Sequence, residues 1–562
     1  MATSLFDYFD DIAAEEGAPA ARWAPRSPYE PDERFDLMLV PRVRGWEEDP
    51  GSLSDLERFE AEPWVEQLTR NGKGVWARLD SGWIERAGAA LEAGEDPGSP
   101  LSEIAGGKRY ALNFWDANST KALHIGHLRN LALGNALGGA FEAAGAKVER
   151  RSIICDVGRS MGEAMAGVVQ SGRHTEAWPA GGQKSDHFVG YCYADYVKSG
   201  RAGSGNGGGD PEDSLARELD LQNDSADQLL QRVLDGDQQA IELWSKTRAW
   251  VISGQRKTLA RLGIAFDRVF FESDFLPEVG ELTELGLREG MLHRCPDGAV
   301  IYATGRKELD EMALLRADGL PTQHMRALAY WTAAPGLDEE MTSIQICGAE
   351  WVAHVTCRRK LMAELAEAGG ADGTIHPKHD VFHEMVSKER QSISSSKKDA
   401  VLIDDLAEWI DTELEAEAAR AEVRRRHPSP ERIAPQVALG FFLMHPTGKR
   451  VDFEPGKLLE ADHSLGWDLA RAQTRNGDAG TAGAGRGEPA QDPEYRFAVV
   501  QSEMHRRHLR QAVEKLDVMQ LARFSSHLSR WYLERERAPH VERTIQTVLD
   551  RSARSLGLEA TR

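Results

Sequence analysis

The chain has 562 residues, of which 41% are hydrophobic, and its formal net charge at pH 7 is −22. This length suits about three or four domains with sizeable cores. The negative charge argues against non-specific binding to DNA, and no apolar run approaches the roughly 18 residues that a membrane span needs.

The cysteines and the first residues indicate a compartment. The five cysteines are odd in number and form no C-x-x-C pair, which is typical of reduced thiols rather than of a disulfide scaffold or a zinc site. The opening stretch, MATSLFDYFDDIAAEEG, is acidic and lacks the basic and then apolar pattern of a secretory signal. We therefore expect a cytoplasmic protein with no metal site of its own and no membrane contact.

The first clear succession of elements predicts a parallel sheet. Residues 110–115 (YALNFW) are typical of a strand, residues 126–144 of a helix with Gly145 just beyond its end, and residues 148–154 of a second strand. A strand, a helix-length crossover and another strand form the βαβ unit of a parallel sheet. Two more apolar, strand-like runs follow, at 299–304 and 342–348. The fold class predicted is therefore α/β, with a doubly wound core and helical additions.

Two segments rich in small residues interrupt the chain. Residues 199–214 (SGRAGSGNGGGDPEDS) predict an exposed insertion within a domain, and residues 476–493 predict a linker. Beyond this linker the apolar residues recur at spacings of three and four, which is the helical period. The sequence therefore predicts an all-α bundle over residues 494–562.

The stretch LNFWDANSTKALHIGHLRN places two histidines where the first helix begins. A helix that starts after a strand has unpaired N–H groups and a positive dipole end, so it can bind an anion. His124 and His127 would add two imidazole donors for a phosphate, and Gly126 would let a flat base approach the backbone. The alternative is that the two histidines merely cap the helix.

A second polar stretch, QSISSSKKDAVLIDDLAEW, follows the last predicted strands. Its serines (Ser394, Ser395 and Ser396) and its lysines (Lys397 and Lys398) precede an apolar run. Serine hydroxyls and lysine ammonium groups in a loop can hold phosphates. A solvated polar loop without a ligand is the alternative for a stretch of this kind.

The order of these two stretches resembles the HIGH and KMSKS motifs of class I aminoacyl-tRNA synthetases, and the details resemble the arginyl-tRNA synthetase family. HIGH is spelled in full at 124–127. Further segments similar to that family are CDVGRSMGEAM (155–165), LLRADGLPTQHMRALAYWTA (314–333), QICGAEWVAHV (345–355) and the stretch at 450–475. The resemblance covers about residues 65 to 562, in order.

The resemblance implies a division of the chain. In this division a class I, Rossmann-like, doubly wound parallel-sheet domain is preceded by a shortened N-terminal domain, because residues 73–94 resemble only the end of the family's own. The implied regions are a tRNA-binding-like domain at 1–105, the catalytic domain at 106–415, a helical connecting region at 416–475, the linker at 476–493 and an anticodon-binding bundle at 494–562.

The resemblance also implies a chemistry. ATP, accompanied by Mg²⁺, activates an amino acid, which then passes to the 3′ end of a tRNA; catalysis is mostly positioning and stabilisation of charge on phosphate oxygens. His124 and His127 would hold the α-phosphate, Gly126 would lie behind the adenine, and the triphosphate would be gripped by Lys397 with Ser394, Ser395 and Ser396. The tRNA would meet a predominantly monomeric protein through bundle residues Arg506, Arg507, Arg510 and Arg530.

The sequence departs from the family in the amino-acid pocket, whose implied residues are Asn113, Asp116, Asn118, Gln323, Ala327 and Trp351. The family binds the guanidinium of its substrate with carboxylates and a tyrosine, because a planar cation needs acceptors at fixed positions. Here the glutamate falls on Asn113, the tyrosine on Gln323 and the aspartate on Ala327, whereas Asn118 is retained. Either Asp116 supplies a relocated carboxylate, or the substrate is a smaller or less cationic amino acid.

Three functions remain open at this point. The first is an arginyl-tRNA synthetase-like ligase that charges tRNA with arginine or an altered amino acid. The second is a paralogue that activates a different amino acid for a biosynthetic acceptor. The third is a non-catalytic, tRNA-binding relative.

Overall fold

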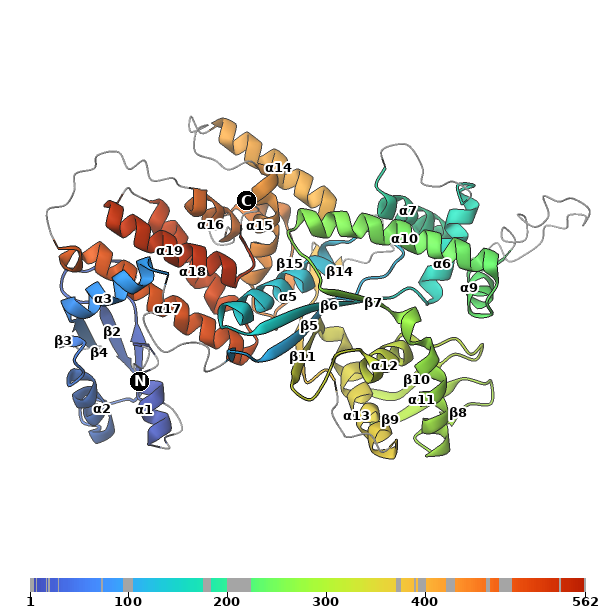
Figure 1. Cartoon of the computed structure of the whole chain (residues 1–562), viewed down its shortest axis with the longest axis horizontal. Helices are drawn as coiled ribbons and strands as arrows, with labels where there is room; N and C mark the ends of the chain where they lie inside the picture. The colour runs from blue at the N-terminus through green and yellow to red at the C-terminus, as the bar shows by residue number, and fades with distance from the viewer. Residues whose placement is uncertain are drawn as a thin grey trace, which may run out of the picture.

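The computed structural model describes most of the chain, and the statements below concern that part (Figure 1). The described residues are 5–6, 8–16, 18, 21–28, 30–71, 74–94, 105–174, 183–199, 224–369, 376–388, 391–392, 401–420, 430–460, 465–474, 488–534 and 537–559. The N-terminal unit lies beside the C-terminal helices, and the central sheet separates them from the β8–β10 unit.

An antiparallel sheet in the order β1-β2-β4-β3 forms the N-terminal unit. Its elements are α1 (Tyr8–Glu15), β1 (Trp23–Arg26), β2 (Leu37–Pro41), α2 (Pro50–Glu60), β3 (Val65–Asn71), β4 (Gly74–Leu79) and α3 (Ser81–Glu92). Aromatic rings fill its core: Phe9 stacks on Phe59 at 5.1 Å between centroids, and Trp23 meets Trp46 edge-on at 4.9 Å. Residues for which the sequence predicted no elements thus form a packed unit.

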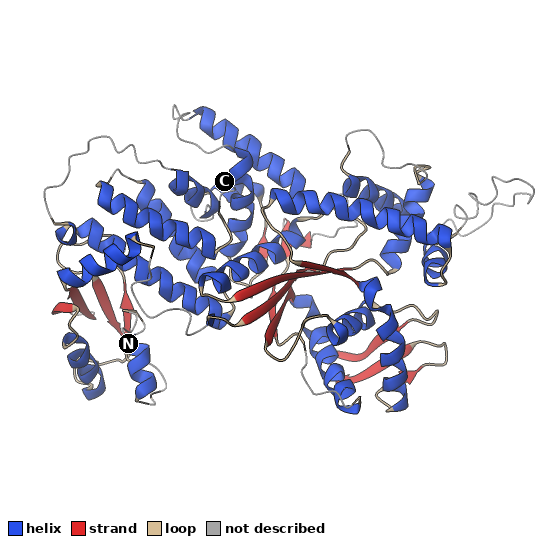
Figure 2. Cartoon of the chain, in the orientation of Figure 1, coloured by secondary structure: helices blue, strands red, loops and turns tan. Residues whose placement is uncertain are grey.

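A five-stranded parallel sheet forms the centre of the molecule (Figure 2). Its strands are β5 (Arg109–Trp115), β6 (Lys147–Ile154), β7 (Arg268–Phe271), β11 (Met341–Gly348) and β12 (His379–His383), in the order β12-β11-β5-β6-β7. Every neighbouring pair is parallel. Along the chain, β6 and β7 are added on one side of β5, and β11 and β12 are then added on its other side. The predicted doubly wound sheet is confirmed.

The winding direction reverses between β5 and β11, which pair with each other. In doubly wound sheets, ligands bind beyond the carboxyl ends of the strands at this reversal. β5 ends at Trp115 and β11 at Gly348. The segments that follow these two residues therefore lie where a site is expected.

Helix α5 (Ile125–Ala143) connects β5 to β6 and is buried on nearly every side. The sheet covers one side, and α15, α17 and α19 pack against the helix elsewhere, which explains why its sequence is apolar all round. Gly134 permits close contact with the sheet, because a Cβ there would lie 2.1 Å from the Phe114 ring. Gly145, with φ of 84°, follows the helix end as predicted.

Two long insertions lie between consecutive strands of the parallel sheet. Between β6 and β7 lie α6 (Arg159–Gln170), α7 (Ser185–Lys198), α9 (Ala226–Leu234) and α10 (Gln238–Arg261). Between β7 and β11 lie η1 (Glu272–Phe275), α11 (Leu276–Arg288), β8 (Leu292–Arg294), β9 (Val300–Arg306), β10 (Leu309–Leu315) and α12 (Gln323–Ala333). β9 forms a hairpin with β10 in a separate antiparallel sheet, so the strand predicted at 299–304 does not extend the parallel one. The Gly-rich segment predicted at 199–214 lies outside the described residues, except for Ser199.

The last part of the chain is mainly helical. After η2 (Ala349–Trp351), α13 (Val352–Ala368) and β12 come β13 (Val386–Lys388), β14 (Gln391–Ser392), α14 (Ile403–Arg420), α15 (Pro430–Leu443), β15 (Val451–Asp452), η3 (Pro455–Leu459), α16 (Leu465–Thr474), η4 (Pro489–Gln491), α17 (Pro493–Lys515), α18 (Met519–Leu533) and α19 (Pro539–Ser555). The predicted helical bundle is confirmed, but it is larger than residues 494–562. Helix α16 packs on α18 and α19, and α15 packs on α16 and α5. The linker predicted at 476–493 lies outside the described residues up to position 487, and the helix before it packs on the helices after it.

A buried ion pair joins the N-terminal unit to the bundle. Arg496 on α17 donates through Nε and Nη2 to the two carboxylate oxygens of Asp36, at 2.9 and 2.6 Å. Removing one partner would leave an uncompensated buried charge, which costs about 3–5 kcal/mol. In the described part of the chain, no helix has the length and apolar character needed to cross a membrane.

Candidate active site

A cavity of about 310 Å³ opens at the carboxyl ends of β5, β6 and β11. Its walls come from the segment after β5, the start of α5, α12, η2 and α13. The residues predicted from sequence that line it are Asp116, Asn118, His124, Gly126, His127, Gln323, Ala327 and Trp351. Positions more than 200 residues apart in the sequence thus share one cavity at the reversal point of the sheet.

The two histidines cap helix α5. His124 is the N-cap residue, and its Nδ1 accepts a hydrogen bond from the Gly126 N–H at 3.1 Å. The His127 Nδ1 accepts from the His124 N–H, also at 3.1 Å. Because both Nδ1 atoms are acceptors, each neutral ring carries its proton on Nε2. Capping therefore leaves one fixed N–H donor on each ring.

The environment of the histidines keeps them uncharged. Burial, and then the nearby Lys121, lowers the pKa of His124 to about 4. Burial, and then His124 and Lys121, holds the pKa of His127 well below its ordinary value. Burial also lowers the pKa of Lys121 itself, to about 8. The positive potential at this point therefore comes from Lys121 and the helix N-terminus rather than from imidazolium charge.

Gly126 is required by the capping geometry. A Cβ at this position would lie 2.9 Å from Cε1 and 3.0 Å from Nδ1 of the His124 ring. Real Cβ contacts are not that short, so any side chain at Gly126 would displace the ring from its capping position. The glycine therefore makes room for the His124 ring, and its predicted contact with a base stays a prediction.

The segment after the predicted Ser/Lys loop is bonded to the histidine segment. Residues 393–400, which contain Ser394, Ser395, Ser396 and Lys397, lie outside the described residues. Directly after them, the Val401 carbonyl accepts from the Ile125 N–H, and the Ile403 N–H donates to the Leu123 carbonyl, both at 3.0 Å. The far end of that loop is therefore fixed to the start of α5.

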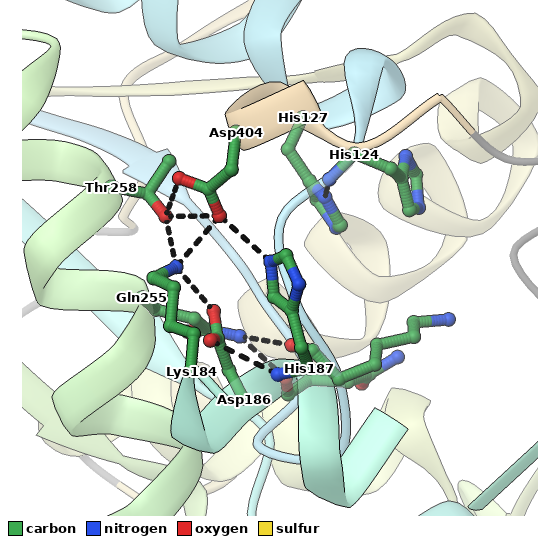
Figure 3. A network of polar contacts seen from close by, with 10 residues as sticks. His124, His127, Lys184, Asp186, His187, Gln255, Thr258 and Asp404 are labelled. Atoms are coloured by element: carbon green, nitrogen blue, oxygen red, sulfur yellow. Dashed lines mark hydrogen bonds and ion pairs between the residues drawn. The ribbon is translucent and has the colours of Figure 1, made fainter. Parts of the chain in front are cut away.

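A network of polar contacts centred on Asp404 ties the first turn of α14 to the insertion helices (Figure 3). Asp404 accepts from Lys184 Nζ at 2.7 Å, from Thr258 Oγ1 at 3.1 Å, and lies 2.9 Å from His187 Nε2. Burial alone would raise the pKa of Asp404, but the bonds from His187 and Lys184 hold it at about 2. Lys184 Nζ also bonds Asp186 at 2.9 Å. Asp186, His187 and Asp404 have the ligand types of a metal site, yet the ammonium group already lies between the two carboxylates.

Helix α10 also supports the segment before His124. Gln255 Nε2 donates to the backbone carbonyls of Asn118 and Lys121, at 3.0 and 2.8 Å (Figure 3). The preceding Gly254 allows α7 to approach, since a Cβ there would lie 2.2 Å from Asp186 Oδ1. Helix α10 thus contacts both the segment just before His124 and, through Thr258, the first turn of α14.

A chain of hydrogen bonds forms the floor of the cavity. Asn113 Nδ2 donates to Asp116 Oδ1 at 2.7 Å, and the Tyr330 hydroxyl donates to Asn113 Oδ1 at 3.2 Å. Arg358 Nη2 donates to Gln345 Oε1 at 2.9 Å, and Gln345 in turn bonds Asp116. The prediction for Asn113 is corrected: it lies beneath Asp116, inside β5, and does not line the cavity.

Asp116 is the carboxyl group in this floor. The Asp116 side chain is open to the cavity, but the protein around it raises its pKa to about 7, although Arg358 and the hydrogen bonds from Asn113 and Gln345 act in the opposite direction. The group therefore exists in both protonation states near neutral pH. A cation entering the cavity would favour the carboxylate.

Aromatic rings and small groups form the opposite wall. Gln323 and Ala327 lie one turn apart on α12, and Ala327 presents only a methyl group to the cavity. The rings of His324 and His354 stack at 4.5 Å, and Trp351 meets both edge-on at 6.0 and 5.6 Å. Helix α12 itself contains no aspartate or glutamate.

A buried ion pair closes the cavity beside β6. Glu272 lines the cavity, and its carboxylate is bonded to Arg326 on α12. Arg326 also donates to Cys155 Sγ at 3.5 Å. Glu272 is therefore already neutralised by a residue of the chain.

Sequence reasoning missed three members of the hydrogen-bonded floor: Gln345, Tyr330 and Arg358. A signal existed for Gln345, which interrupts the apolar strand TSIQICG and pairs in register with Asn113, the polar residue of YALNFW. Polar residues inside buried strands are hydrogen-bonded, so the two indicated a network. For Arg358, which lies in the charged sequence CRRKL, no sequence signal separated it from surface arginines.

The arginines predicted to contact tRNA are not equally available. The Arg506 side chain is 6% exposed and lies 3.7 Å from Glu503, so the prediction that it faces away from the core is wrong. Arg507 donates to the backbone carbonyls of Phe6 and Pro25. Both are used for packing because α17 has neighbours on several sides, including α3, α18 and α19.

The other two arginines are partly exposed. Arg510 pairs with Glu514 at 3.0 Å, with 36% of its side chain exposed. Arg530 lies 3.6 Å from Asp468, with 29% of its side chain exposed. These two remain on the surface of the bundle.

Comparison with known proteins identifies the relatives of the chain. Residues 102–304 match the family described as "tRNA synthetases class I (R), catalytic domain". The arginine–tRNA ligase of Treponema pallidum is 32% identical over 38% of this chain and 33% of its own length. That of Borrelia turicatae is 24% identical over 60% of this chain and 55% of its own length. The sequence match thus spans about a third to a half of these curated relatives.

The fold extends further than the sequence match. The arginyl-tRNA synthetase of Thermus thermophilus superposes with a TM-score of 0.67 and 19% identity, covering 99% of both chains. That of Plasmodium falciparum gives a TM-score of 0.62 at 12% identity. The chain therefore has the fold of an arginyl-type class I synthetase, from the parallel sheet to the helical bundle, and resembles these enzymes in sequence over a part that includes residues 102–304.

Proposed function

We propose, from the premise that this chain resembles class I arginyl-tRNA synthetases, that it is an aminoacyl-tRNA ligase. It activates an amino acid with ATP and transfers it to the 3′ end of a tRNA. The observation that carries the proposal is the pair of uncharged histidines at the N-terminus of α5, each with its Nδ1 used in capping and an Nε2–H left as donor.

In the first step, a carboxylate oxygen of the amino acid attacks the α-phosphorus of ATP. One O–P bond forms, the bond to the bridging oxygen breaks, and pyrophosphate leaves. Negative charge grows on the α-phosphate oxygens, and fixed donors are most effective where charge develops. We assign this role to the Nε2–H groups of His124 and His127, with Lys121 and the helix N-terminus adding positive potential.

The triphosphate is assigned to Lys397 and to Ser394, Ser395 and Ser396. Support comes from the residues that follow them, because Val401 is hydrogen-bonded to Ile125 at the start of α5. Mg²⁺ enters as the companion of ATP, held by the phosphates. The one cluster of metal-ligand types among the described residues is occupied by Lys184, so it does not fit a cation.

In the second step, a ribose hydroxyl at the 3′ end of the tRNA attacks the activated carbonyl carbon. An ester bond forms, and AMP leaves with the phosphate oxygen. The helical bundle contacts the tRNA through exposed cations, for which Arg510 and Arg530 are the partly exposed candidates. Deleting residues 494–562 would not test this contact, because α5, α15 and α16 would lose the helices that cover them.

The identity of the amino acid has two candidates. The relatives are named arginine–tRNA ligases, which favours arginine. Ala327, which places a methyl group on the cavity wall, favours a paralogue that activates a different amino acid for a tRNA or a biosynthetic acceptor. A non-catalytic relative is less well supported, because a protein that only binds tRNA has no use for two helix-capping histidines that each keep an Nε2–H donor.

We also propose a cytoplasmic location and a monomeric state. All five cysteines are unpaired, which is typical of a reducing compartment. The oligomeric state stays a prediction that size-exclusion chromatography with light scattering tests.

The proposal is tested by ATP–pyrophosphate exchange with the full chain. Each of the twenty amino acids is supplied in turn, with and without total tRNA, and tRNA labelling is measured in parallel. We expect exchange with one or a few amino acids and labelling of tRNA by the same ones. Exchange without labelling would indicate a non-tRNA acceptor, and no exchange with any amino acid would overturn the proposal.

The tRNA contact is tested by replacing Arg510 and Arg530 together with alanine. Binding of labelled tRNA should weaken, and the slope of log affinity against log salt should fall by up to about 2. Arg288→Ala, on the exposed face of α11, is the matched control. An unchanged slope would exclude these two arginines from the contact.

A further inference from the structure

Arg358 brings a positive charge into the amino-acid side of the cavity. It lies on α13, is 6% exposed and lines the cavity. Its guanidinium donates to the neutral amide oxygen of Gln345 at 2.9 Å. Within the described residues, no ion pair includes it, whereas the adjacent cations have carboxylate partners: Arg326 pairs with Glu272 and Arg359 with Asp380.

A buried guanidinium without a carboxylate is costly. Burial lowers the pKa of Arg358 below its ordinary value, but an arginine side chain remains charged in proteins. The remaining stabilisation must come from acceptors that approach it. Since Arg358 lines the cavity, the ligand that fills the cavity is placed to supply one.

Asp116 stands at the other end of the same floor. Gln345 is bonded to both residues, accepting from Arg358 and bonding Asp116. The floor therefore presents a group of donors and a group of acceptors, connected by one amide. With Asp116 ionised, their charges cancel.

This arrangement is a poor receptor for a guanidinium. Arginine would bring a second permanent cation beside Arg358, and the carboxyl group bonded into the floor is Asp116. Glu350 on η2 also lines the cavity, but it is exposed and is not part of the hydrogen-bonded floor. The opposite wall offers the methyl group of Ala327, and Glu272 is neutralised by Arg326. Two cations side by side at the floor of a protein cavity repel each other more strongly than they would in water.

A neutral group with both donors and an acceptor matches the floor. A carboxamide or a urea can donate N–H to Asp116 and accept from Arg358 through its carbonyl oxygen, without adding charge. A site built on such hydrogen bonds rejects a partner that leaves its buried groups unpaired, by factors of roughly 10⁴ in favourable cases.

We propose that Arg358 is a specificity-determining residue that directs this cavity toward amino acids whose side chain ends in an uncharged carboxamide or urea. Arginine is correspondingly a poor substrate. This inference rests on the proposed amino-acid activation and specifies its substrate class.

The test compares ATP–pyrophosphate exchange with arginine, lysine, glutamate, asparagine, glutamine and citrulline, each with total tRNA present. For the unmodified protein, we expect kcat/KM to be at least about tenfold higher with one of the last three than with arginine. Highest activity with arginine or glutamate would overturn the inference while leaving amino-acid activation intact. No exchange with any amino acid would overturn both.

Variants at Arg358 separate specificity from folding. Arg358→Met keeps the side chain long and removes its charge, so the ratio of arginine to amide or urea activation should rise on the order of 10-fold to 10²-fold. Arg358→Lys keeps the charge and should preserve most of the original preference. Lys360→Met, two residues further along and with 59% of its side chain exposed, should leave the ratio unchanged. A ratio unmoved in Arg358→Met, with the protein folded by circular dichroism and still exchanging, would exclude Arg358 from specificity.

Discussion

The two sides of the cavity hold their residues in different ways. On the side of the histidines, positions are fixed by the backbone: Gly126 and His124 donate N–H bonds to the capping rings, and Val401 and Ile403 are bonded to Ile125 and Leu123. On the amino-acid side, positions are fixed by side chains, in the series from Tyr330 through Asp116 to Arg358.

This difference explains where the sequence departs from the arginyl-tRNA synthetase family. Capping rings and backbone bonds tolerate little substitution, because a Cβ at Gly126 would meet the His124 ring at 2.9 Å. A network of side chains can be exchanged as a set while β5, β11 and α12 keep their places. The same fold can therefore keep the histidine side while the residues of the other side change.

Replacing His127 by asparagine should have the largest effect. The asparagine oxygen can still accept from the His124 N–H, so α5 stays capped, but the Nε2–H donor is lost. We expect the rate of adenylate formation to fall on the order of 10²-fold for every amino acid alike. Single-turnover kinetics of adenylate formation measure this rate, and His293→Ala on exposed β8 is the control. A loss restricted to one amino acid would contradict the assignment of His127 to the phosphate side.

Ala327→Asp should act on the other side alone. An acid on α12 facing the cavity gives a guanidinium the partner that it lacks, so arginine activation should rise about 10-fold relative to the native substrate. The KM for ATP should stay within about twofold. Asn113 is left unchanged, because a glutamate there would lie against Asp116. If the variant raised the KM for ATP as much as it changed amino-acid preference, the two sides would not be separable.

Asp404→Asn should disturb the histidine side from a distance. The amide loses the charge that Lys184 and His187 contact, which loosens the anchor of α14 behind the Ser/Lys loop. We expect the KM for ATP to rise about 5-fold with little change in amino-acid preference. Asp405→Asn, exposed on the same turn, should behave as the unmodified chain. Equal effects of the two variants would remove the Asp404 network from this role.

Asp116→Asn should give the smallest effect, on stability. The pKa of Asp116 is raised to about 7 in the folded chain, so its contribution to stability is full below its ordinary pKa of 3.8 and is lost as pH rises through 7. Asparagine does not titrate. The variant should therefore gain roughly 1–3 °C in Tm, relative to the unmodified chain, between pH 5 and pH 8. Calorimetry at both pH values measures the gain, and a gain that shrinks with pH would contradict the raised pKa.

Local patterns in the sequence were sufficient for the central part of the fold. The spacing of apolar residues and the glycine after the helix predicted β5, α5 and β6 within one or two residues. The motif HIGH predicted that the two histidines stand at the start of α5. The family resemblance that they imply is confirmed. The N-terminal sheet was not predicted, because its strands are short and its core is made of scattered aromatic residues such as Phe9 and Phe59.

The sequence by itself determined that β5, α5 and β6 form and that two histidines stand at the start of α5, because helical period, capping and glycine at a close contact are local properties. Only the tertiary structure decided that Arg506 is buried, that Asn113 lies beneath Asp116, and that Arg358 shares a cavity with both ends of the site. Burial and pairing of a charged side chain depend on neighbours brought from distant positions. No local pattern distinguishes Arg358, which lines the cavity, from Arg359, which pairs with Asp380 one residue later.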